Sequence, residues 1–266
     1  MLPLAFVDLE TTGATATSDR ITEIGIVEVD TDGTVREWQQ LVNPGTRIPT
    51  FIEQLTGISN AMVADAPAFA DVAGETLRRL EGRLFIAHNA RFDYGFLKNE
   101  FKRLGIAFRA PVVCTVRLSR ALFPEHRRHN LDSLIERHGL VAEARHRALA
   151  DAQLIHQFWQ KIHVDRSPAA IESALQAQNT RPSLPPQLDP GIIDELPETP
   201  GVYLFYGENN LPLYIGKARD IRQRMLSHFS ADHTSAKEMA LSQQVKRIDW
   251  IETAGEIGAL LKEAAL

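Results

Sequence analysis

The order of strand-like and helix-like segments constrains the fold of this chain more than any other feature of its sequence. Three runs rich in β-branched residues come first, at 2–10, 20–30 and 35–42, and Asp32-Gly33 between the last two is a strong hairpin signal. These runs predict an antiparallel meander of three strands at the start of the chain.

Short apolar runs and helical patterns alternate after the meander. Apolar residues at helical intervals predict helices at 68–82, 91–105, 130–139 and 148–162, and short apolar runs predict strands at 84–89 and 111–116. Three strands followed by alternating strands and helices predict an α/β fold, in which a mixed sheet is flanked by helices.

A proline-rich stretch divides the chain. Prolines recur through 177–201 and oppose helix or central strand there, so we predict a first domain at 1–165, a linker at 166–196 and a second domain at 197–266. The second domain opens with a hairpin and continues with helices and a short strand. This pattern predicts a small α+β unit.

Composition excludes several classes of protein. Cys114 is the only cysteine, so an internal disulfide framework is excluded, which fits a reducing, cytoplasmic location. No apolar run approaches the roughly 18 residues of a membrane span, and the N-terminal residues lack the basic lead-in of a signal peptide. We therefore expect a soluble protein without a membrane partner.

The charge distribution gives a weaker signal. A formal net charge of -5 provides no general attraction to nucleic acid. Seven arginines nevertheless outnumber the acids between them: Arg117, Arg120, Arg127, Arg128, Arg137, Arg145 and Arg147. They predict either a local basic face or ordinary solvated helix surfaces.

Two acids stand close together in the first strand. Asp8 and Glu10 are two residues apart, so both side chains leave the same face of the strand, about 7 Å apart along the backbone. Side by side at the end of an apolar strand, they repel each other and lose hydration unless cations neutralise them. The residues predict a metal site, and surface acids on a strand entering solvent are the alternative.

Two further segments carry acids near the start of an expected helix. Asp93 falls in the first turn of a helix that follows the strand ending at His88-Asn89, where an acid can also be a simple helix cap. His146 and Asp151 are five residues apart, about 140° around one helix. They can share a site only if His146 precedes that helix.

Together these segments resemble the DnaQ-like DEDDh exonucleases, a family that includes the proofreading epsilon subunit of bacterial DNA polymerase III. The matching motifs are FVDLETTG, HNARFD and HRALAD, within residues 1 to about 165. The resemblance implies a ribonuclease H-like fold and hydrolysis at 3' ends that releases nucleoside 5'-monophosphates. It further implies that two Mg²⁺ or Mn²⁺ ions are bound by Asp8, Glu10 and Asp151, that Asp93 helps to hold the second ion, and that His146 is the general base.

The residue types suit that chemistry. Carboxylate oxygens are hard ligands, and two ions about 3.5 to 4 Å apart can activate a water and stabilise a leaving oxygen. A histidine that titrates near neutrality can accept the proton of the water. By the same resemblance the substrate-binding candidates are Thr11, Thr12, Leu55, Ile58, His88 and Asn89. For the two threonines, a role in the turn is equally consistent with the sequence.

The second domain resembles the GIY-YIG endonuclease domain, most closely the version found in UvrC excision nucleases. The matching residues are Gly201-Val202-Tyr203 and Tyr214-Ile215-Gly216, followed by Lys217-Ala218-Arg219. The resemblance implies that Tyr203 and Tyr214 activate the attacking water. It assigns phosphate binding to Arg224, substrate binding to Lys217, and a single divalent ion to Glu263.

Structural roles stay open for the same residues. Tyrosines in strands usually pack, and Glu263 alone is consistent with a solvated helix acid. Leu266 follows Glu263 by three residues, whereas the helix of the family continues, so we expect a C-terminally short domain with a weakly held glutamate. Cutting by this domain is therefore left open.

The leading hypothesis is a DNA repair nuclease that degrades 3' ends with its first domain and docks on or nicks DNA with its second. One alternative is a proofreading subunit tied to a polymerase or sliding clamp, for which Gln187-Leu188-Asp189 is a faint match to a clamp-binding peptide. The others are an RNA-trimming exonuclease and, for the second domain, a nucleic-acid-binding module that does not cut.

Overall fold

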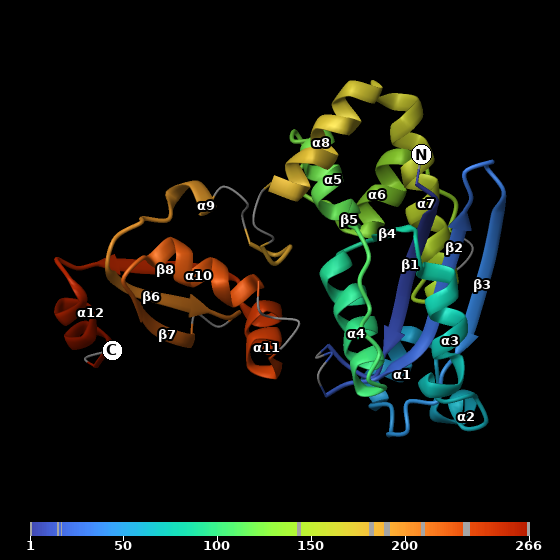
Figure 1. Cartoon of the computed structure of the whole chain (residues 1–266), viewed down its shortest axis with the longest axis horizontal. Helices are drawn as coiled ribbons and strands as arrows, with labels where there is room; N and C mark the ends of the chain where they lie inside the picture. The colour runs from blue at the N-terminus through green and yellow to red at the C-terminus, as the bar shows by residue number, and fades with distance from the viewer. Residues whose placement is uncertain are drawn as a thin grey trace. The chain divides into compact units, whose positions relative to one another are not determined.

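The chain forms two compact units in a computed structural model, Met1–Arg181 and Pro182–Leu266. The structure describes residues 2–14, 16, 18–142, 145–180, 184–188, 192–208, 211–230 and 235–264. Figure 1 shows unit 1 in blue to yellow and unit 2 in orange to red. Each unit has its own apolar core.

A five-stranded mixed sheet is the centre of unit 1. Its strands are β1 (Leu4–Thr11), β2 (Ile21–Val29), β3 (Val35–Leu41), β4 (Leu84–Ala87) and β5 (Val112–Cys114), in the order β3-β2-β1-β4-β5. The β1, β2 and β3 pairs are antiparallel, and β4 pairs in parallel with β1 and β5. The predicted meander and mixed sheet are confirmed.

Eight helices of the described residues surround this sheet (Figure 1). They are α1 (Thr50–Thr56), α2 (Asn60–Val63), α3 (Phe69–Leu80), α4 (Ala90–Arg103), α5 (Thr115–Leu122), α6 (Leu131–His138), α7 (Ala148–Asp165) and α8 (Pro168–Thr180). Leu4 and Phe6 of β1 pack with Ile155 and Phe158 of α7, so α7 covers the face to which the even-numbered β1 residues point. None of the described helices has the length and hydropathy needed to span a bilayer.

Two elements differ from the sequence-based prediction. The strand expected at 111–116 ends at Cys114, because the buried side chains of Val116 and Leu118 belong to helix α5. The first half of the expected linker is helix α8, in which Ile171 and Ala174 pack into the core of unit 1. Its proline stands at the first helical position, where the missing N–H costs no hydrogen bond.

Unit 2 is a three-stranded antiparallel sheet with helices on both faces. Its elements are α9 (Ile192–Glu195), β6 (Gly201–Tyr206), β7 (Pro212–Ala218), α10 (Ile221–Ser230), α11 (Ala236–Gln244), β8 (Arg247–Glu252) and α12 (Glu256–Ala264), with the strand order β7-β6-β8. Tyr203 and Phe205 pack against α10, whereas Val202 and Leu204 pack with Ala259 of α12. The small α+β unit is confirmed.

The candidate clamp-binding peptide is part of unit 2. Leu188 is buried in the core of that unit, and the side-chain amide of Gln187 donates to the backbone carbonyls of Ser242 and Gln243. Asp189 lies outside the described residues. The first two side chains of this faint match are thus engaged within the unit, and binding to a sliding clamp stays a prediction.

The start of α7 lies directly on β2. A Cβ atom added at Gly25 would stand 2.2 Å from the carbonyl carbon of Ala148 and 2.3 Å from the amide nitrogen of Leu149. Real Cβ atoms do not approach backbone so closely, so only glycine permits this crossing. The residue at position 25 thereby sets the distance between α7 and the sheet.

We expect Gly25→Ala to destabilise unit 1 by about 2 kcal/mol or more, because the added methyl group forces α7 away from β2. Urea unfolding measures this. Gly74→Ala in α3 is the matched control: its added Cβ meets no atom within 4 Å, so it should stabilise by roughly 0.5 to 1 kcal/mol. Equal stabilities of the two variants would contradict the close approach.

Candidate active sites in the two units

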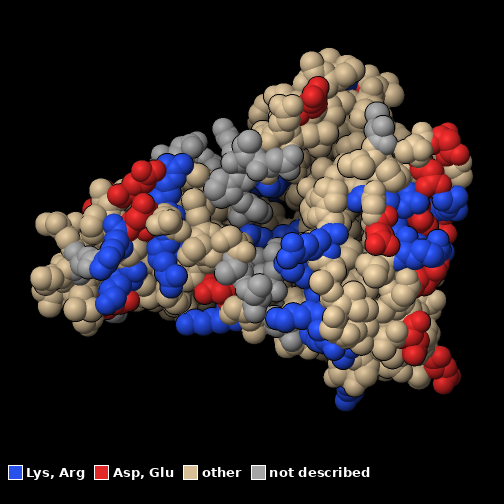
Figure 2. Space-filling model, in the orientation of Figure 1, with Lys and Arg blue, Asp and Glu red and all other residues tan. Residues whose placement is uncertain are grey.

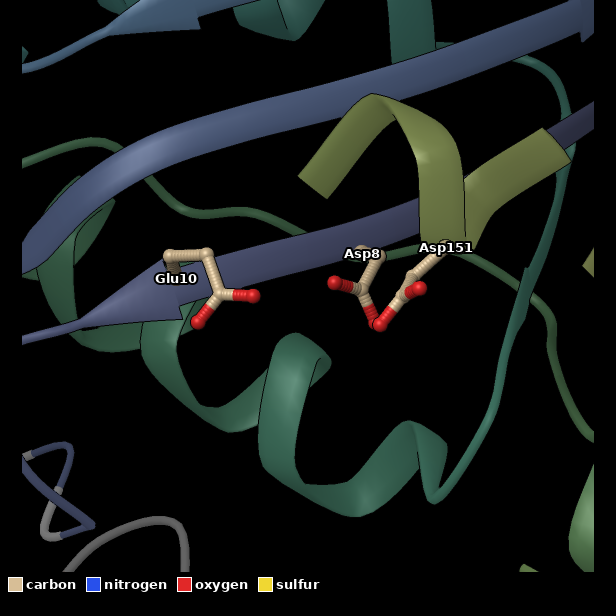
Figure 3. Close-up of side chains that lie close together, drawn as sticks. All are labelled: Asp8, Glu10 and Asp151. Atoms are coloured by element: carbon tan, nitrogen blue, oxygen red, sulfur yellow. The ribbon is translucent and has the colours of Figure 1, made fainter. Parts of the chain in front are cut away.

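The first candidate site begins with a row of side chains on β1. Leu4 and Phe6 are buried in the core on the α7 side, and Asp8 and Glu10 continue the same row because side chains two apart share a face. The strand therefore carries its apolar residues into the core and its acids toward the start of α7. Figure 3 shows both acids on this strand.

Asp151, in the first turn of α7, completes a cluster of three carboxylates. One oxygen from each of Asp8, Glu10 and Asp151 lies within 4.8 Å of the others. In Figure 3 the carboxylates of Asp8 and Asp151 point toward each other, and Glu10 lies farther along β1. The fold thus joins residues from the start and the middle of the chain into one acidic site.

A buried clamp fixes the start of α7. Glu23 of β2 is fully buried, and its carboxylate accepts hydrogen bonds from the Arg147 guanidinium at 2.5 Å and from the Ala148 backbone N–H at 2.9 Å. Gln39 of β3 donates to the same carboxylate at 2.7 Å. These bonds hold the helix end, and with it Asp151, against the sheet.

Asp93 stands beside the cluster. It is 2% exposed in the first turn of α4, and that helix starts after Asn89, whose backbone is left-handed with φ 67°. A backbone hydrogen bond from Leu9 of β1 reaches the Asp93 carboxylate and opposes the rise of its pKa caused by burial. Its charge acts on Asp8, so it is a fourth acid of the same site.

Burial and mutual repulsion disfavour charge on these acids. Burial is the main cause that raises the pKa of Asp8 well above its usual range, followed by the charges of Asp93, Asp151 and Glu10. Burial and the Asp151 charge raise the pKa of Glu10 to about 8. Divalent cations remove both costs, since their charge replaces the protons and their preferred ligands are carboxylate oxygens. The residues present therefore fit a divalent metal centre.

Arg145 already places a positive charge against the cluster. Its guanidinium pairs with Asp151 and, at 3.0 Å, with Asp132 of α6. Its charge lowers the pKa of Asp8 and Glu10, against the larger effect of burial. The sequence showed it only as one of seven arginines, because its partners belong to two other elements.

His146 precedes α7 instead of lying on it. Its backbone is left-handed with φ 57°, and its side chain is partly exposed between Arg145 and Arg147. If His146 were part of the helix, its side chain would point about 140° away from that of Asp151. Its position before the helix avoids this. The ligand-spaced group consists of Asp8, Glu10 and Asp151, so His146 adjoins the cluster along the chain without belonging to it.

The candidate substrate contacts near β1 have different exposures. Thr11 and Thr12 are buried, and their hydroxyls bond to the Gly13 carbonyl and the Arg20 amide, which are turn roles. Leu55 is 54% exposed and remains available to a ligand. Ile58 is fully buried against Ile48 and Val63, so its prediction as a nucleotide contact is wrong for this structure.

His88 and Asn89 lie at the turn between β4 and α4. The His88 Nδ1 atom is 3.0 Å from the hydroxyl of Thr115, and burial lowers the pKa of His88 to about 4. His88 is therefore neutral at physiological pH. Asn89 supplies the left-handed residue that starts α4, which is a structural role.

The second candidate site lies on the α10 side of unit 2. Tyr203 is fully buried and stacks on the half-buried Tyr214, with ring centroids 5.9 Å apart. The exposed Arg224 of α10 lies beside both phenols, which raise its pKa. Burial and Tyr214 raise the pKa of Tyr203. Because Tyr203 is enclosed, direct contact with a substrate water falls to Tyr214.

Glu263 belongs to the other face of the unit 2 sheet. It lies 3.9 Å from the ammonium group of Lys217, a residue paired across strands with Val202, which packs under α12. Together with Lys217 it is separated by the sheet from the face on which Tyr203 packs. The acid cluster with ligand spacing found among the described residues is the one in unit 1.

We expect the metal-free protein to lose stability as the pH rises from 4.5 to about 8, and Glu10→Gln to lose less. In the folded state the Glu10 pKa is about 8 against 4.5 normally. Its contribution is therefore fully present below pH 4.5 and is lost as the pH rises through about 8. Thermal unfolding in a chelator measures the difference, in which effects common to both proteins cancel. Identical pH dependences would contradict the burial of Glu10 among acids.

Comparison with known proteins gives a consistent assignment. Residues 5–158 match the Exonuclease family, and residues 199–266 match the UvrC-like GIY-YIG domain. A Mycobacterium tuberculosis protein named as a bifunctional exonuclease/endonuclease is 33% identical over 97% of this chain and 42% of its own length. The 3'-5' exonuclease DinG of Bacillus subtilis is 40% identical over 56% of this chain and 16% of its own. The chain thus spans less than half of these relatives.

Solved structures resemble the chain in the same way. Exonuclease X in complex with 5' overhanging duplex DNA is 25% identical with a TM-score of 0.50, covering 65% of this chain and 99% of that one. Exonuclease I of E. coli in complex with a dA16 oligonucleotide is 18% identical, with a TM-score of 0.56. The match covers 77% of this chain and 48% of that one, and it shows the shared fold. From its matched motifs and its fold, this chain belongs to the Exonuclease family, of the DnaQ-like type with a ribonuclease H-like fold, and carries a UvrC-like GIY-YIG domain.

Proposed function

We propose that unit 1 is a metal-dependent 3'-5' exonuclease that hydrolyses phosphodiester bonds at DNA 3' ends and releases nucleoside 5'-monophosphates. The observation that carries this proposal is the group of three carboxylates within 4.8 Å, with Asp93 buried beside them. The raised pKa values of Asp8 and Glu10 favour a bound cation over charged acids without one.

The side chains divide the work. Asp8, Glu10 and Asp151 would hold two Mg²⁺ or Mn²⁺ ions, and Asp93, buried beside them, would support the second. Such ions, when bound, activate water and stabilise the leaving oxygen. His146 accepts the proton of the attacking water, for which its partly exposed position before α7 suits it. Leu55 contacts the terminal nucleotide from the exposed end of α1.

DNA is the favoured substrate. Both solved neighbours named above were captured with DNA. In Figure 2, Lys and Arg side chains gather on the visible face of unit 1 near α4. Among the described residues, Lys102 near the end of α4 and Arg109 after it are exposed. Positive side chains of this kind position a phosphate backbone without reading its sequence.

We expect the full chain to shorten 5'-labelled single-stranded DNA from its 3' end in Mg²⁺ or Mn²⁺, and Asp8→Ala to abolish the ladder because it removes a metal ligand. His146→Ala should bind the same ions but react on the order of 10² to 10⁴ times more slowly. Denaturing gels measure both rates. Asp65→Ala, which removes an exposed acid after α2, is the control and should leave the ladder unchanged.

Two results would contradict this function. A ladder that persists in Asp8→Ala would remove the acidic cluster from the reaction. A ladder on a matched RNA and none on DNA would replace the DNA substrate by the RNA-trimming alternative. A role in DNA repair, rather than as a proofreading subunit, is the part of the proposal that depends on unit 2.

We propose that unit 2 docks on DNA and nicks it, which would place the exonuclease at sites of repair. The clustering of Tyr203, Tyr214 and Arg224 supports this role, since a guanidinium matches phosphate geometry and phenols can relay protons. Glu263 and Lys217 lie on the other face, so their predicted roles in holding a single divalent ion and the substrate stay apart from the cluster of Tyr203, Tyr214 and Arg224.

We expect the full chain carrying Asp8→Ala to nick supercoiled plasmid in Mg²⁺ or Mn²⁺, and a further Arg224→Ala change to suppress nicking because the phosphate loses its ligand. Arg247→Ala on β8 is the control for a lost positive charge. Agarose gels measure relaxation of the plasmid. DNA binding without nicking in the parent would identify unit 2 as a module that binds and does not cut.

A further inference from the structure

A chain of hydrogen bonds runs inward from the second candidate site. The phenol oxygen of Tyr203 lies 2.6 Å from Nε2 of His228, and Nδ1 of His228 lies 2.6 Å from a carboxylate oxygen of Glu238. The three residues come from β6, α10 and α11. None of the motifs recognised in the sequence includes His228 or Glu238.

The donors in this chain follow from chemistry. A carboxylate only accepts, so His228 must carry its hydrogen on Nδ1 and donate it to Glu238. In a neutral imidazole Nε2 is then an acceptor, so Tyr203 donates its O–H to His228. Tyr203 has no second hydrogen, so toward its neighbours Tyr214 and Arg224, which both act on its pKa, its oxygen can only accept. The hydrogens of Tyr203 and His228 therefore both point inward, toward Glu238.

The surroundings favour proton movement along this path. His228 is 3% exposed, and its ring contacts those of Phe205 and Tyr214 at centroid distances of 5.5 and 5.0 Å. The low polarity of such a site strengthens hydrogen bonds to charged groups. Burial lowers the pKa of His228, so its ring is neutral before the reaction, and among the charged groups around it Glu238 favours its protonation whereas Arg224 and Lys237 oppose it.

Two sequence features build the path. Gly216 leaves room for the phenol, since an added Cβ would stand 2.6 Å from the Tyr203 oxygen. Ser235, three residues before the glutamate, caps α11 by accepting from the Glu238 amide. A glutamate at that position commonly bonds back to the capping residue. Here its carboxylate instead reaches His228.

We propose that Glu238 and His228 form the inner end of a proton relay. The relay carries one proton away from the attacking water through Tyr214 and Tyr203. The proposal rests on the nicking activity proposed for unit 2. The oxygen of a water bonds to phosphorus while the bond to the leaving sugar oxygen breaks. One proton of that water passes to Tyr214, the phenol protons each move one place inward, and His228 gains a proton at Nε2. The leaving oxygen is protonated by solvent, and the relay later returns its proton outward.

Glu238 is a positioning residue in this scheme. Its carboxylate holds Nε2 of His228 toward Tyr203 and stabilises the imidazolium formed when the proton arrives, as the acid does in a serine protease triad. Tyr214 alone is accessible enough to meet the water, since Tyr203 is fully buried. The arrangement therefore explains how an enclosed tyrosine contributes to a reaction at the surface.

The test uses the full chain with Asp8→Ala as parent, so that the exonuclease is silent. Glu238→Gln and Tyr203→Phe should each lower kcat for plasmid nicking on the order of 10²-fold or more with KM unchanged. Glu252→Gln, which changes an acid of β8 bonded to Thr199, is the matched control and should leave both constants unchanged. Thermal unfolding confirms that each variant is folded.

Nitrogen-15 NMR of labelled histidine measures the tautomer and the pKa of His228. A merely structural role of Glu238 would leave both unchanged. We expect Nδ1–H on His228 in the parent, and a lower His228 pKa in Glu238→Gln because the carboxylate is gone. Unchanged kcat in Glu238→Gln, or a hydrogen on Nε2 in the parent, would overturn the relay while nicking stands. Absence of nicking in the parent would overturn the endonuclease proposal, and the relay with it.

Discussion

The close contact between α7 and β2 is the constraint on which the exonuclease site depends. Gly25 lets the backbone of Ala148 touch the strand, and Glu23 ties that helix end by bonds to Arg147 and to the Ala148 amide. Asp151 follows one turn later, beside the acids of β1. A helix end held less closely would leave Asp8 and Glu10 as repelling charges with no third ligand.

Both candidate sites bury ionisable groups away from water, which costs free energy. The two sites offset this cost in different ways. In unit 1 the carboxylates repel each other, so a divalent ion is the group that makes the site stable when charged. In unit 2 the buried Tyr203 and His228 each have a partner: Tyr203 donates to His228, and His228 donates to Glu238. The first arrangement is built to bind cations and the second to move protons.

The sequence predicted the acids and the sheet because their signals are local. The period of two in a strand places Asp8 with Glu10, and the start of a helix after a buried strand locates Asp93. The ion pair that Glu23 forms with Arg147 at the start of α7 could not be predicted, since the two residues are 124 positions apart in the sequence. Helix α8 was not predicted because the prolines that follow it favoured a linker. The role of His228 was not predicted because its partner Glu238 belongs to another helix.

Direct titration with Mn²⁺ tests the central claim that the acidic cluster is a metal centre. Isothermal calorimetry of the full chain at the pH where Glu10 is mostly ionised, above about 8, should detect binding of two ions in unit 1. Asp8→Asn should lose those sites while unit 2 retains any site of its own. Equal Mn²⁺ binding by wild type and Asp8→Asn would contradict the account.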